Sequence, residues 1–372
     1  MRMLSRHLAY RSSGKRSANR FLTTMPYVQT CMIDGGSPSN TSAAIGPGAF
    51  RLALAGVVVL DHFYGVLLGR AAVYVFFVLS GYWITKMWSS RYTGADAPYL
   101  TYMTARLWRL APTMLVSSAF AVLVAIAVLK INPLTVSGVD PAHQIFSHLF
   151  FLGYSQLPTP RLLDPAWSLD IEMRFYLIAP FLILVMERYG LRVFVALVLC
   201  ASALQTVIPA SGLGFLALFA AGMIAAKKDW RPSRRLSTGS LLAIAALFAG
   251  LYLSGHLDVL TDRGLHDANT ALSWVLAGLA APYAIATCHE PGGERDRMFG
   301  DLSYSVYLIH WPVVVMMHAA QGATGLTALA CVALSFGLAF LALNLVDQPL
   351  QTLRARWVSF QPKARSAVEA VS

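Results

Sequence analysis

Arg51 and His62 are the first residues whose types and spacing indicate chemistry. They lie in RLALAGVVVLDHFYGVLLGR, residues 51–70, which is apolar apart from its two arginines, Asp61 and His62. Eleven residues at about 100° each return the two side chains to within about 20° of one helix face, roughly 16 Å apart along the axis. Ionisable groups inside a membrane span are costly and usually face a protein interior or a water-filled cavity. This pair therefore marks a candidate site.

The pair predicts an extended ligand. We expect Arg51 at the boundary with cytoplasmic water and His62 near the middle of the membrane. A ligand that contacts both has an anionic head and a reactive group roughly 16 Å away, which describes acyl-coenzyme A. A neutral imidazole is suited to act as general base on a sugar hydroxyl. The alternative is a structural histidine bonded to a neighbouring backbone carbonyl. Asp61 points about 100° away and is interpreted as an interhelical or cavity-facing residue.

Two further segments suit the donor. FFVLSGYWIT contains Ser80 and Gly81, a small pair that lets another backbone or a ligand arm approach closely, although by itself it is typical of ordinary membrane packing. ARLWRLAP places Arg106 and Arg109 on one face of a predicted interfacial helix over residues 90–112. Arginine suits bidentate phosphate capture. The alternative is the positive charge that cytoplasmic segments of any membrane protein carry.

The segment PAWSLDIEMRFYLIAP carries Asp170, Glu172 and Arg174 into an apolar helix. Glu172 and Arg174 are two residues apart and do not face each other, so each is expected to find a partner on another helix or on a ligand. The sequence leaves three roles open for Glu172: accepting a proton, orienting an imidazole, or neutralising an arginine.

The segment LSYSVYLIHWP repeats polar groups at Tyr304, Tyr307 and His310, three residues apart along one helix face. This stripe suits a polar cavity wall that hydrogen-bonds a sugar, and aromatic packing is the alternative. The outer segment 131–165, which contains HLFFLGYS, is predicted to form the outer wall of a substrate site.

The composition indicates an all-α integral membrane protein. Of 372 residues, 56% are hydrophobic and 13% are charged, whereas soluble domains carry about 25% charge. Apolar runs bounded by Gly, Pro and charge predict about ten transmembrane helices. These lie near residues 50–69, 71–88, 111–129, 166–186, 191–208, 212–226, 239–255, 271–288, 302–320 and 324–346.

The distribution of positive charge predicts that both termini are cytoplasmic. With that orientation, most of the 29 Lys and Arg residues fall on inner segments, as the positive-inside rule requires, and Arg174 lies within a span. The outer segments hold only Arg70, Lys130, Arg161 and Arg263. The net charge of +11 therefore reflects topology, and no nucleic-acid partner is expected.

Three regions are predicted along the chain. Residues 1–49 form a basic lead, interpreted either as a disordered cytoplasmic segment or as an over-long start, since Met25 and Met32 offer later ones. Residues 50–350 form the membrane domain, and residues 351–372 a short cytoplasmic tail. The four cysteines suggest no disulfide framework.

Taken in order, these segments resemble the acyltransferase 3 family of membrane-bound O-acyltransferases, which acylate bacterial polysaccharides and other glycosides. The resemblance rests on Arg51 and His62 with ten residues between them, followed by FFVLSG, RLWRLAP, WSLDIEMRFY, LSYSVYLIH and VDQP. Each motif is weak alone, whereas the ordered set over residues 50–350 is specific.

The resemblance implies an enzyme of the bacterial cytoplasmic (inner) membrane. It transfers an acyl group, commonly acetyl, from cytoplasmic acyl-coenzyme A to a sugar hydroxyl, with the coenzyme as co-substrate and no permanently bound cofactor. Together with the patterns above, the resemblance predicts that His62 and Glu172 are catalytic residues. The predicted donor-binding residues are Arg51, Arg106, Arg109, Ser80 and Gly81, and the predicted acceptor-binding residues are Tyr304, Tyr307, His310, Arg174 and Trp167.

The chain departs from the family pattern at three positions. Ala72 and Tyr74 stand where the family places Gly and an acidic residue before FFVLSG. Arg174 stands where the family often has Gln, and we hypothesise that it contacts an anionic acceptor. No metal is expected, because His62 and the other candidate ligands show no chelating spacing on one element.

A transporter or flippase is the alternative function. A polar cavity inside a helical bundle serves translocation as well as catalysis, and it would be lined by the same kinds of residue. Transporters often contain two halves of similar pattern, and no such duplication is visible in this sequence.

Overall fold

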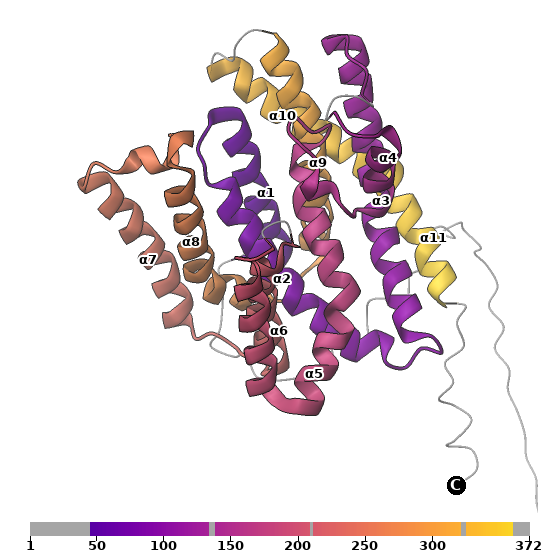
Figure 1. Ribbon diagram of the computed structural model, residues 1–372, viewed down its shortest axis with the longest axis vertical. Coiled ribbons are helices and arrows are strands. Elements are labelled where there is room, and N and C mark those ends of the chain that lie inside the picture. Colours follow the sequence, from indigo (N-terminus) through magenta and orange to yellow (C-terminus); the bar gives the residue numbers. More distant parts are fainter. Residues whose placement is uncertain (1–44, 134–137, 209–210, 321–324, 360–372) are drawn as a thin grey trace, which may run out of the picture. The chain divides into compact units, whose positions relative to one another are not determined.

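The computed structural model describes residues 45–133, 138–208, 211–320 and 325–359. These belong to one compact unit, Ser39–Ser372, while the other unit, Met1–Pro38, lies outside the described residues. Within the described ranges the chain is helical and contains no strand, as the composition predicts (Figure 1). The helices are α1 (Pro47–Tyr64), α2 (Gly69–Met87), α3 (Pro98–Val124), α4 (Pro141–Phe150), α5 (Trp167–Leu204), α6 (Leu216–Lys227), α7 (Arg234–Leu253), α8 (His266–Thr287), α9 (Glu294–Ala319), α10 (Gly325–Ala342) and α11 (Gln348–Ser359).

Each predicted span falls on one of these helices. The fourth and fifth spans share α5, which Gly190 divides by adopting a left-handed backbone at φ 83°. Among the described residues, five stretches are long and apolar enough to cross a membrane: Gly69–Tyr92, Pro98–Leu129, Arg234–Leu253, Arg263–Thr287 and Gly325–Leu353. The chain is thus a helical membrane protein, and the count of ten spans and the side of each terminus stay predictions.

Two sequence expectations about prolines are wrong. The predicted interfacial helix over residues 90–112 begins only at Pro98, and from there it forms one helix with the span after it, α3, which runs through Pro112. Proline removes one backbone donor, which a membrane helix tolerates when neighbouring helices pack around it, and Pro112 is buried. The sequence VDQP also suggests that Pro349 ends the last helix, because proline cannot continue one. The chain instead stays helical there: the π-helical turn Leu343–Asp347 joins α10 directly to α11, and Pro349 is the second residue of α11.

The helices α1 and α9 run parallel in a single register. The backbone N–H groups of Gly48 and Ala49 donate to the two carboxylate oxygens of Asp296, each at 2.9 Å. This carboxylate therefore caps the start of α1, where its charge also complements the helix dipole. Gly48 and Asp296 are 248 residues apart. His62 and His310 have the same offset (310 − 62 = 248), and their rings stack at 5.3 Å.

Glycines allow the closest helix contacts. A Cβ atom at Gly48 would overlap the backbone carbonyl of Asp296, so the start of α1 requires glycine. The crossing of α2 and α6 is equally close, because a Cβ at Gly81 would meet the Phe219 carbonyl and one at Gly222 would meet the Val78 carbonyl. Small residues let membrane helices approach in this way.

We predict that Gly48→Ala destabilises the protein by about 1–3 kcal/mol, because the new methyl group overlaps a backbone atom that cannot move alone. Gly56→Ala on the same helix is the control, since its Cβ would meet nothing within 4 Å and alanine favours helices by up to about 1 kcal/mol. Thermal unfolding in detergent measures both. Equal melting temperatures for the two variants would contradict the described contact between α1 and α9.

Candidate active site

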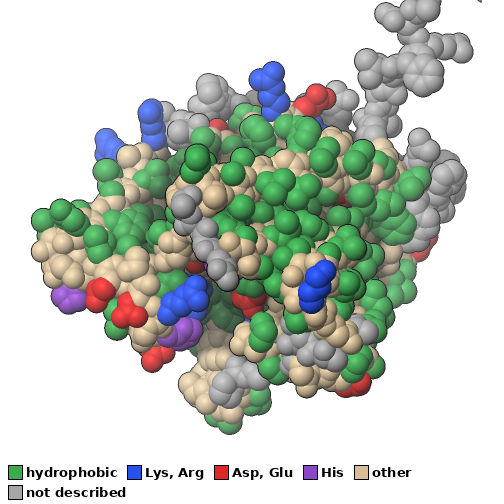
Figure 2. Space-filling view, turned by 90° about the horizontal axis from the view of Figure 1, so that it is seen from above, with side chains coloured by type: hydrophobic (Ala, Val, Ile, Leu, Met, Phe, Trp, Pro, Cys, Tyr) green, Lys and Arg blue, Asp and Glu red, His purple; other side chains and the backbone are tan. Residues whose placement is uncertain are grey.

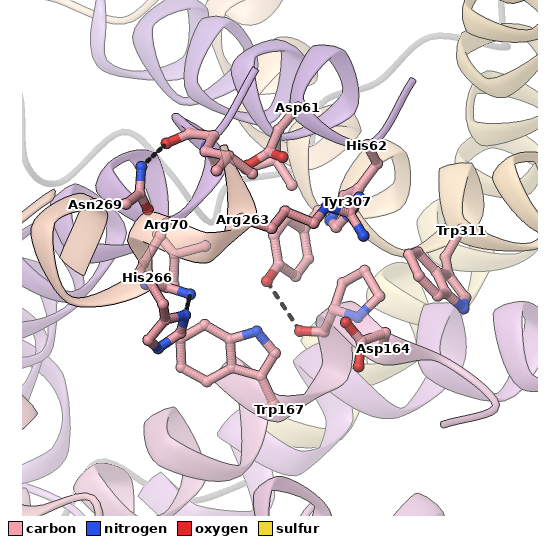
Figure 3. A pocket seen from close by; sticks show the side chains of 15 residues that line it. Asp61, His62, Arg70, Asp164, Trp167, Arg263, His266, Asn269, Tyr307 and Trp311 are labelled. Atoms are coloured by element: carbon pink, nitrogen blue, oxygen red, sulfur yellow. Dashed lines mark hydrogen bonds between the residues drawn. The ribbon is translucent and has the colours of Figure 1, made fainter. Parts of the chain in front are cut away.

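A cavity of about 360 Å³ opens at the end of the bundle where α1 turns into α2 and where α7 connects to α8. We call this the pocket end, and the opposite end, where α1 begins, the arginine end. Figure 2 looks onto the pocket end and shows a hollow edged by basic, acidic and histidine side chains. The ionisable and amide groups that line the cavity are Asp61, His62, Arg70, Asp164, Arg263, His266 and Asn269, with Trp167, Tyr307 and Trp311 as aromatic walls (Figure 3).

Asp61 holds the turn that shapes this cavity. The helix α1 ends at Gly65, whose positive φ of 70° directs the chain away, and the carboxylate of Asp61 accepts a 2.6 Å hydrogen bond from the first N–H of α2, at Gly69. The turn is fastened to the connection between α7 and α8. The N–H of Leu67 donates to the Leu260 carbonyl at 2.7 Å, and the Asn269 amide donates to the Leu67 carbonyl at 2.8 Å.

His62 lies in the last turn of α1, because α1 ends at Tyr64 and not near residue 69 as the predicted span did. Its ring stacks on His310 and meets Trp311 edge-on at 5.1 Å. Among the described residues, neither ring nitrogen of His62 has a hydrogen-bond partner. The alternative of a histidine bonded to a backbone carbonyl does not describe His62, and its ring nitrogens can serve a ligand in the cavity.

His310, unlike His62, is hydrogen-bonded to a backbone carbonyl. Its Nδ1 is 3.0 Å from the Val306 carbonyl one turn earlier, and its Nε2 is buried without a partner among the described residues. Because the two rings stack, His310 fixes the orientation of the His62 ring.

The tyrosines of the α9 stripe join different helices. The Tyr304 hydroxyl donates to the Leu110 carbonyl of α3 at 2.9 Å. The Tyr307 hydroxyl lies 2.9 Å from the Pro165 carbonyl and 2.7 Å from the hydroxyl of Ser168. Of these two tyrosines, Tyr307 lines the cavity, together with Trp167. Tyr307 therefore forms part of the cavity wall and also joins α9 to α5, while Tyr304 joins α9 to α3.

Glu172 lies between the two ends. One of its carboxylate oxygens accepts hydrogen bonds from Ser80 of α2 at 2.7 Å and from Tyr176, one turn along α5, at 2.5 Å. Ser80 thus contacts the predicted catalytic acid, while the adjacent Gly81 packs against the backbone of α6. Glu172 is also near enough to Arg51 for the two charges to interact.

The three arginines of the arginine end have different surroundings. Arg51 packs on the Phe76 ring at 6.0 Å, and its Nε is buried without a partner among the described residues. Arg106 donates to the Tyr92 hydroxyl at 3.1 Å. Arg109 forms ion pairs with Asp301 of α9 at 2.8 Å and with the buried Asp347 at 3.7 Å.

Arg174 does not line the cavity. Its guanidinium holds Asp170 on the same helix with two hydrogen bonds of 2.8 Å and donates to the Ser211 carbonyl at 3.1 Å. Asp170 is fully buried and accepts further bonds from the backbone N–H groups of Gly153 and Ser155. The pair therefore anchors the segment before α5. The sequence-based expectation that Arg174 finds its partner on another helix or on a ligand overlooked Asp170, four positions earlier on the same helix.

Several cavity residues were not among the predicted site residues: Asp164, Arg70, Arg263, His266 and Asn269. One signal in the sequence points to two of them, because Arg70 and Arg263 are among the four basic residues on predicted outer segments. Of the predicted outer wall, residues 131–165, Asp164 and Pro165 line the cavity. The helix α4 instead exposes apolar side chains, among them Phe146 and Phe150.

A family comparison decides the class of enzyme. The family described as "Acyltransferase domain", acyltransferase 3, matches residues 41–345. The chain belongs to the acyltransferase 3 family. It is therefore a membrane acyltransferase, as the ordered motifs indicate. Comparisons with curated proteins and with solved structures gave no match.

We predict that Arg174→Gln lowers the free energy of unfolding by roughly 3 kcal/mol, because it leaves the Asp170 carboxylate buried without its cation. Activity per folded molecule should stay unchanged, since Arg174 does not line the cavity. Lys227→Gln is the control, because its ion pair with Glu187 is exposed and contributes little. Thermal unfolding and specific activity in detergent measure both. A loss of activity without a loss of stability would restore Arg174 as a substrate contact.

Proposed function

We propose that this membrane acyltransferase moves an acyl group, most simply acetyl, from acyl-coenzyme A at the arginine end to a sugar hydroxyl in the cavity. The observation that carries the proposal is the placement of Arg51 and His62 at opposite ends of α1, roughly 16 Å apart along one face. Among the described residues Arg51 forms no ion pair, which suits the anionic coenzyme head, and the His62 ring nitrogens form no hydrogen bond, which suits proton transfer in the cavity.

Arg51 and Arg106 are the proposed contacts for the coenzyme phosphates. Neither forms an ion pair with a carboxylate in the part of the chain that the structure describes, whereas Arg109 is held by Asp301 and Asp347. Guanidinium groups recognise phosphate with paired hydrogen bonds. We therefore assign Arg109 to joining α3, α9 and the end of α10, and the other two arginines to the donor.

His62 is the proposed general base. It accepts the proton of the acceptor hydroxyl, whose oxygen attacks the thioester carbonyl carbon; the new ester bond forms as the carbon–sulfur bond breaks, and the coenzyme leaves as its thiol after taking up a proton. General-base catalysis of this kind contributes about 10²–10⁴-fold. His310 and Trp311 hold the imidazole against the wall of the cavity, so the His62 side chain loses less conformational freedom when the acceptor binds.

Glu172 is proposed to act from the middle of the bundle. Its hydrogen bonds from Ser80 and Tyr176 place two hydroxyl groups between the arginine end and the cavity. Such groups suit the amides of the coenzyme's extended arm. Its charge also lies near Arg51 and would orient that guanidinium toward the coenzyme.

The proposed setting is the bacterial inner membrane with the arginine end in the cytoplasm, where acyl-coenzyme A is made. The positive charge on the segments at that end supports this orientation. The proposed acceptors are a surface polysaccharide, its lipid-linked precursor or another glycoside. Membership of an acyltransferase family favours this function over the transporter considered from the sequence.

We predict that His62→Asn reduces thiol release from acetyl-coenzyme A by about 10²–10⁴-fold while acetyl-coenzyme A still binds. Arg51→Gln should instead raise KM by about tenfold or more, because a hydrogen bond to a charged group contributes about 1.5–3 kcal/mol. Thiol release by purified, detergent-solubilised protein and binding by calorimetry give the two readouts.

The control is His256→Asn, a solvent-exposed histidine outside the cavity lining, which should behave as the native protein does. Full turnover by the His62 variant would contradict the proposal that His62 is the general base. A native sample that neither binds nor consumes any short acyl-coenzyme A would contradict the proposal that acyl-coenzyme A is the donor.

A further inference from the structure

The cavity has two guanidinium groups on its wall, Arg70 at the start of α2 and Arg263 before α8. They come from segments almost 200 residues apart in sequence, which the α1–α2 turn and the α7–α8 connection bring together. Figure 3 shows Arg70 and His266 on one side of the cavity and Asp164 and Trp311 on the other. The basic groups therefore face a space large enough for a sugar ring and its substituents.

The two carboxylates of the cavity have other partners. Asp61 accepts the Gly69 N–H at 2.6 Å and so belongs to the turn between α1 and α2. Asp164 is paired with Arg161, three residues earlier, at 3.1 Å. With Asp164 paired to Arg161, Arg70 and Arg263 share a single nearby carboxylate, Asp61, so the two guanidinium groups leave an excess of positive charge in the cavity.

Neither arginine of the cavity forms an ion pair with any carboxylate among the described residues. Arg70 is half-buried; its guanidinium donates to the Thr270 hydroxyl and lies 3.5 Å from the His266 ring nitrogen, and these contacts hold it in one place. Arg263 is exposed at the mouth, and its charge acts on both His62 and Asp61. A positioned guanidinium that forms no ion pair is suited to a carboxylate or phosphate oxyanion.

We propose that Arg70 and Arg263 form an anion subsite for the acceptor, so that the enzyme acylates a sugar that carries a carboxylate or a phosphate. This deepens the proposed function and rests on it, since the subsite lies in the cavity that contains His62. Binding of the anion by the two arginines places the hydroxyl-bearing part of the acceptor against the imidazole. It also assigns the recognition of negative charge to these residues and not to Arg174.

Binding of small probes tests the subsite without requiring acyl transfer. Trp167 and Trp311 line the cavity, so the intrinsic fluorescence of the purified protein reports on occupancy. The probes are glucuronate, inorganic pyrophosphate and neutral glucose, titrated at constant ionic strength. We expect glucuronate or pyrophosphate to bind at least tenfold more tightly than glucose. Preference for glucuronate indicates an acidic sugar, and preference for pyrophosphate a sugar attached to a lipid through phosphates.

Two variants and a control connect this binding to the named residues. Arg263→Gln and Arg70→Gln should each weaken binding of the preferred anion at least tenfold and leave the affinity for acetyl-coenzyme A unchanged. Lys130→Gln, an exposed basic residue outside the cavity lining, should change neither. Thermal unfolding shows whether Arg70→Gln remains folded, and Arg263→Gln, whose side chain is exposed, provides the test if it does not.

Equal affinities for glucose and both anions, or anion binding that survives Arg263→Gln, would overturn the subsite. That result would leave the donor and the base untouched, because thiol release from acetyl-coenzyme A is measured separately. Conversely, anion binding in a protein that does not consume acetyl-coenzyme A would remove the proposed function and keep the subsite as a binding site alone.

Discussion

The parallel register between α1 and α9 is the constraint on which the candidate site depends. At one end Asp296 accepts two backbone N–H groups of α1, and at the other His62 stacks on His310, with the same offset of 248 residues. Two helices joined at both ends cannot slide past each other without breaking the cap or the stack. The distance between the arginine end and the cavity is therefore fixed by the backbone of a single helix.

Three carboxylates, of which Asp170 and Asp347 are buried, organise the remaining elements around this pair. Asp61 holds the α1–α2 turn, Asp170 holds Arg174 and the segment before α5, and Asp347 holds Arg109. Each acid accepts hydrogen bonds from backbone amides or from an arginine, which offsets the cost of removing a charge from water. Asp61 thereby shapes the cavity, and Asp170 and Asp347 fix the segments around it. Glu172, at mid-bundle, accepts hydrogen bonds from the hydroxyl groups of Ser80 and Tyr176.

Much of the fold and part of the site could be predicted from the sequence. Apolar runs located the helices because burial in lipid requires about 20 apolar residues, and the helical repeat placed Arg51 and His62 on one face. The position of His62 in the last turn of α1 was not predictable from the apolar run, because the helix ends at Tyr64, before the run ends. The partnership of Arg109 with Asp347 and the meeting of Arg70 with Arg263 depend on contacts between distant segments, which periodicity does not report.

The most direct test of the account asks whether the two ends of the site face opposite sides of the membrane. Single cysteines at Ser90, near the arginine end, and at Thr261, beside the cavity, are introduced into a chain whose native cysteines are replaced by alanine; both positions are exposed. A membrane-impermeant maleimide is then applied to sealed, right-side-out cells before and after permeabilisation. The account predicts labelling of Thr261→Cys in sealed cells and of Ser90→Cys only after permeabilisation. Labelling of both positions from the same side would contradict it.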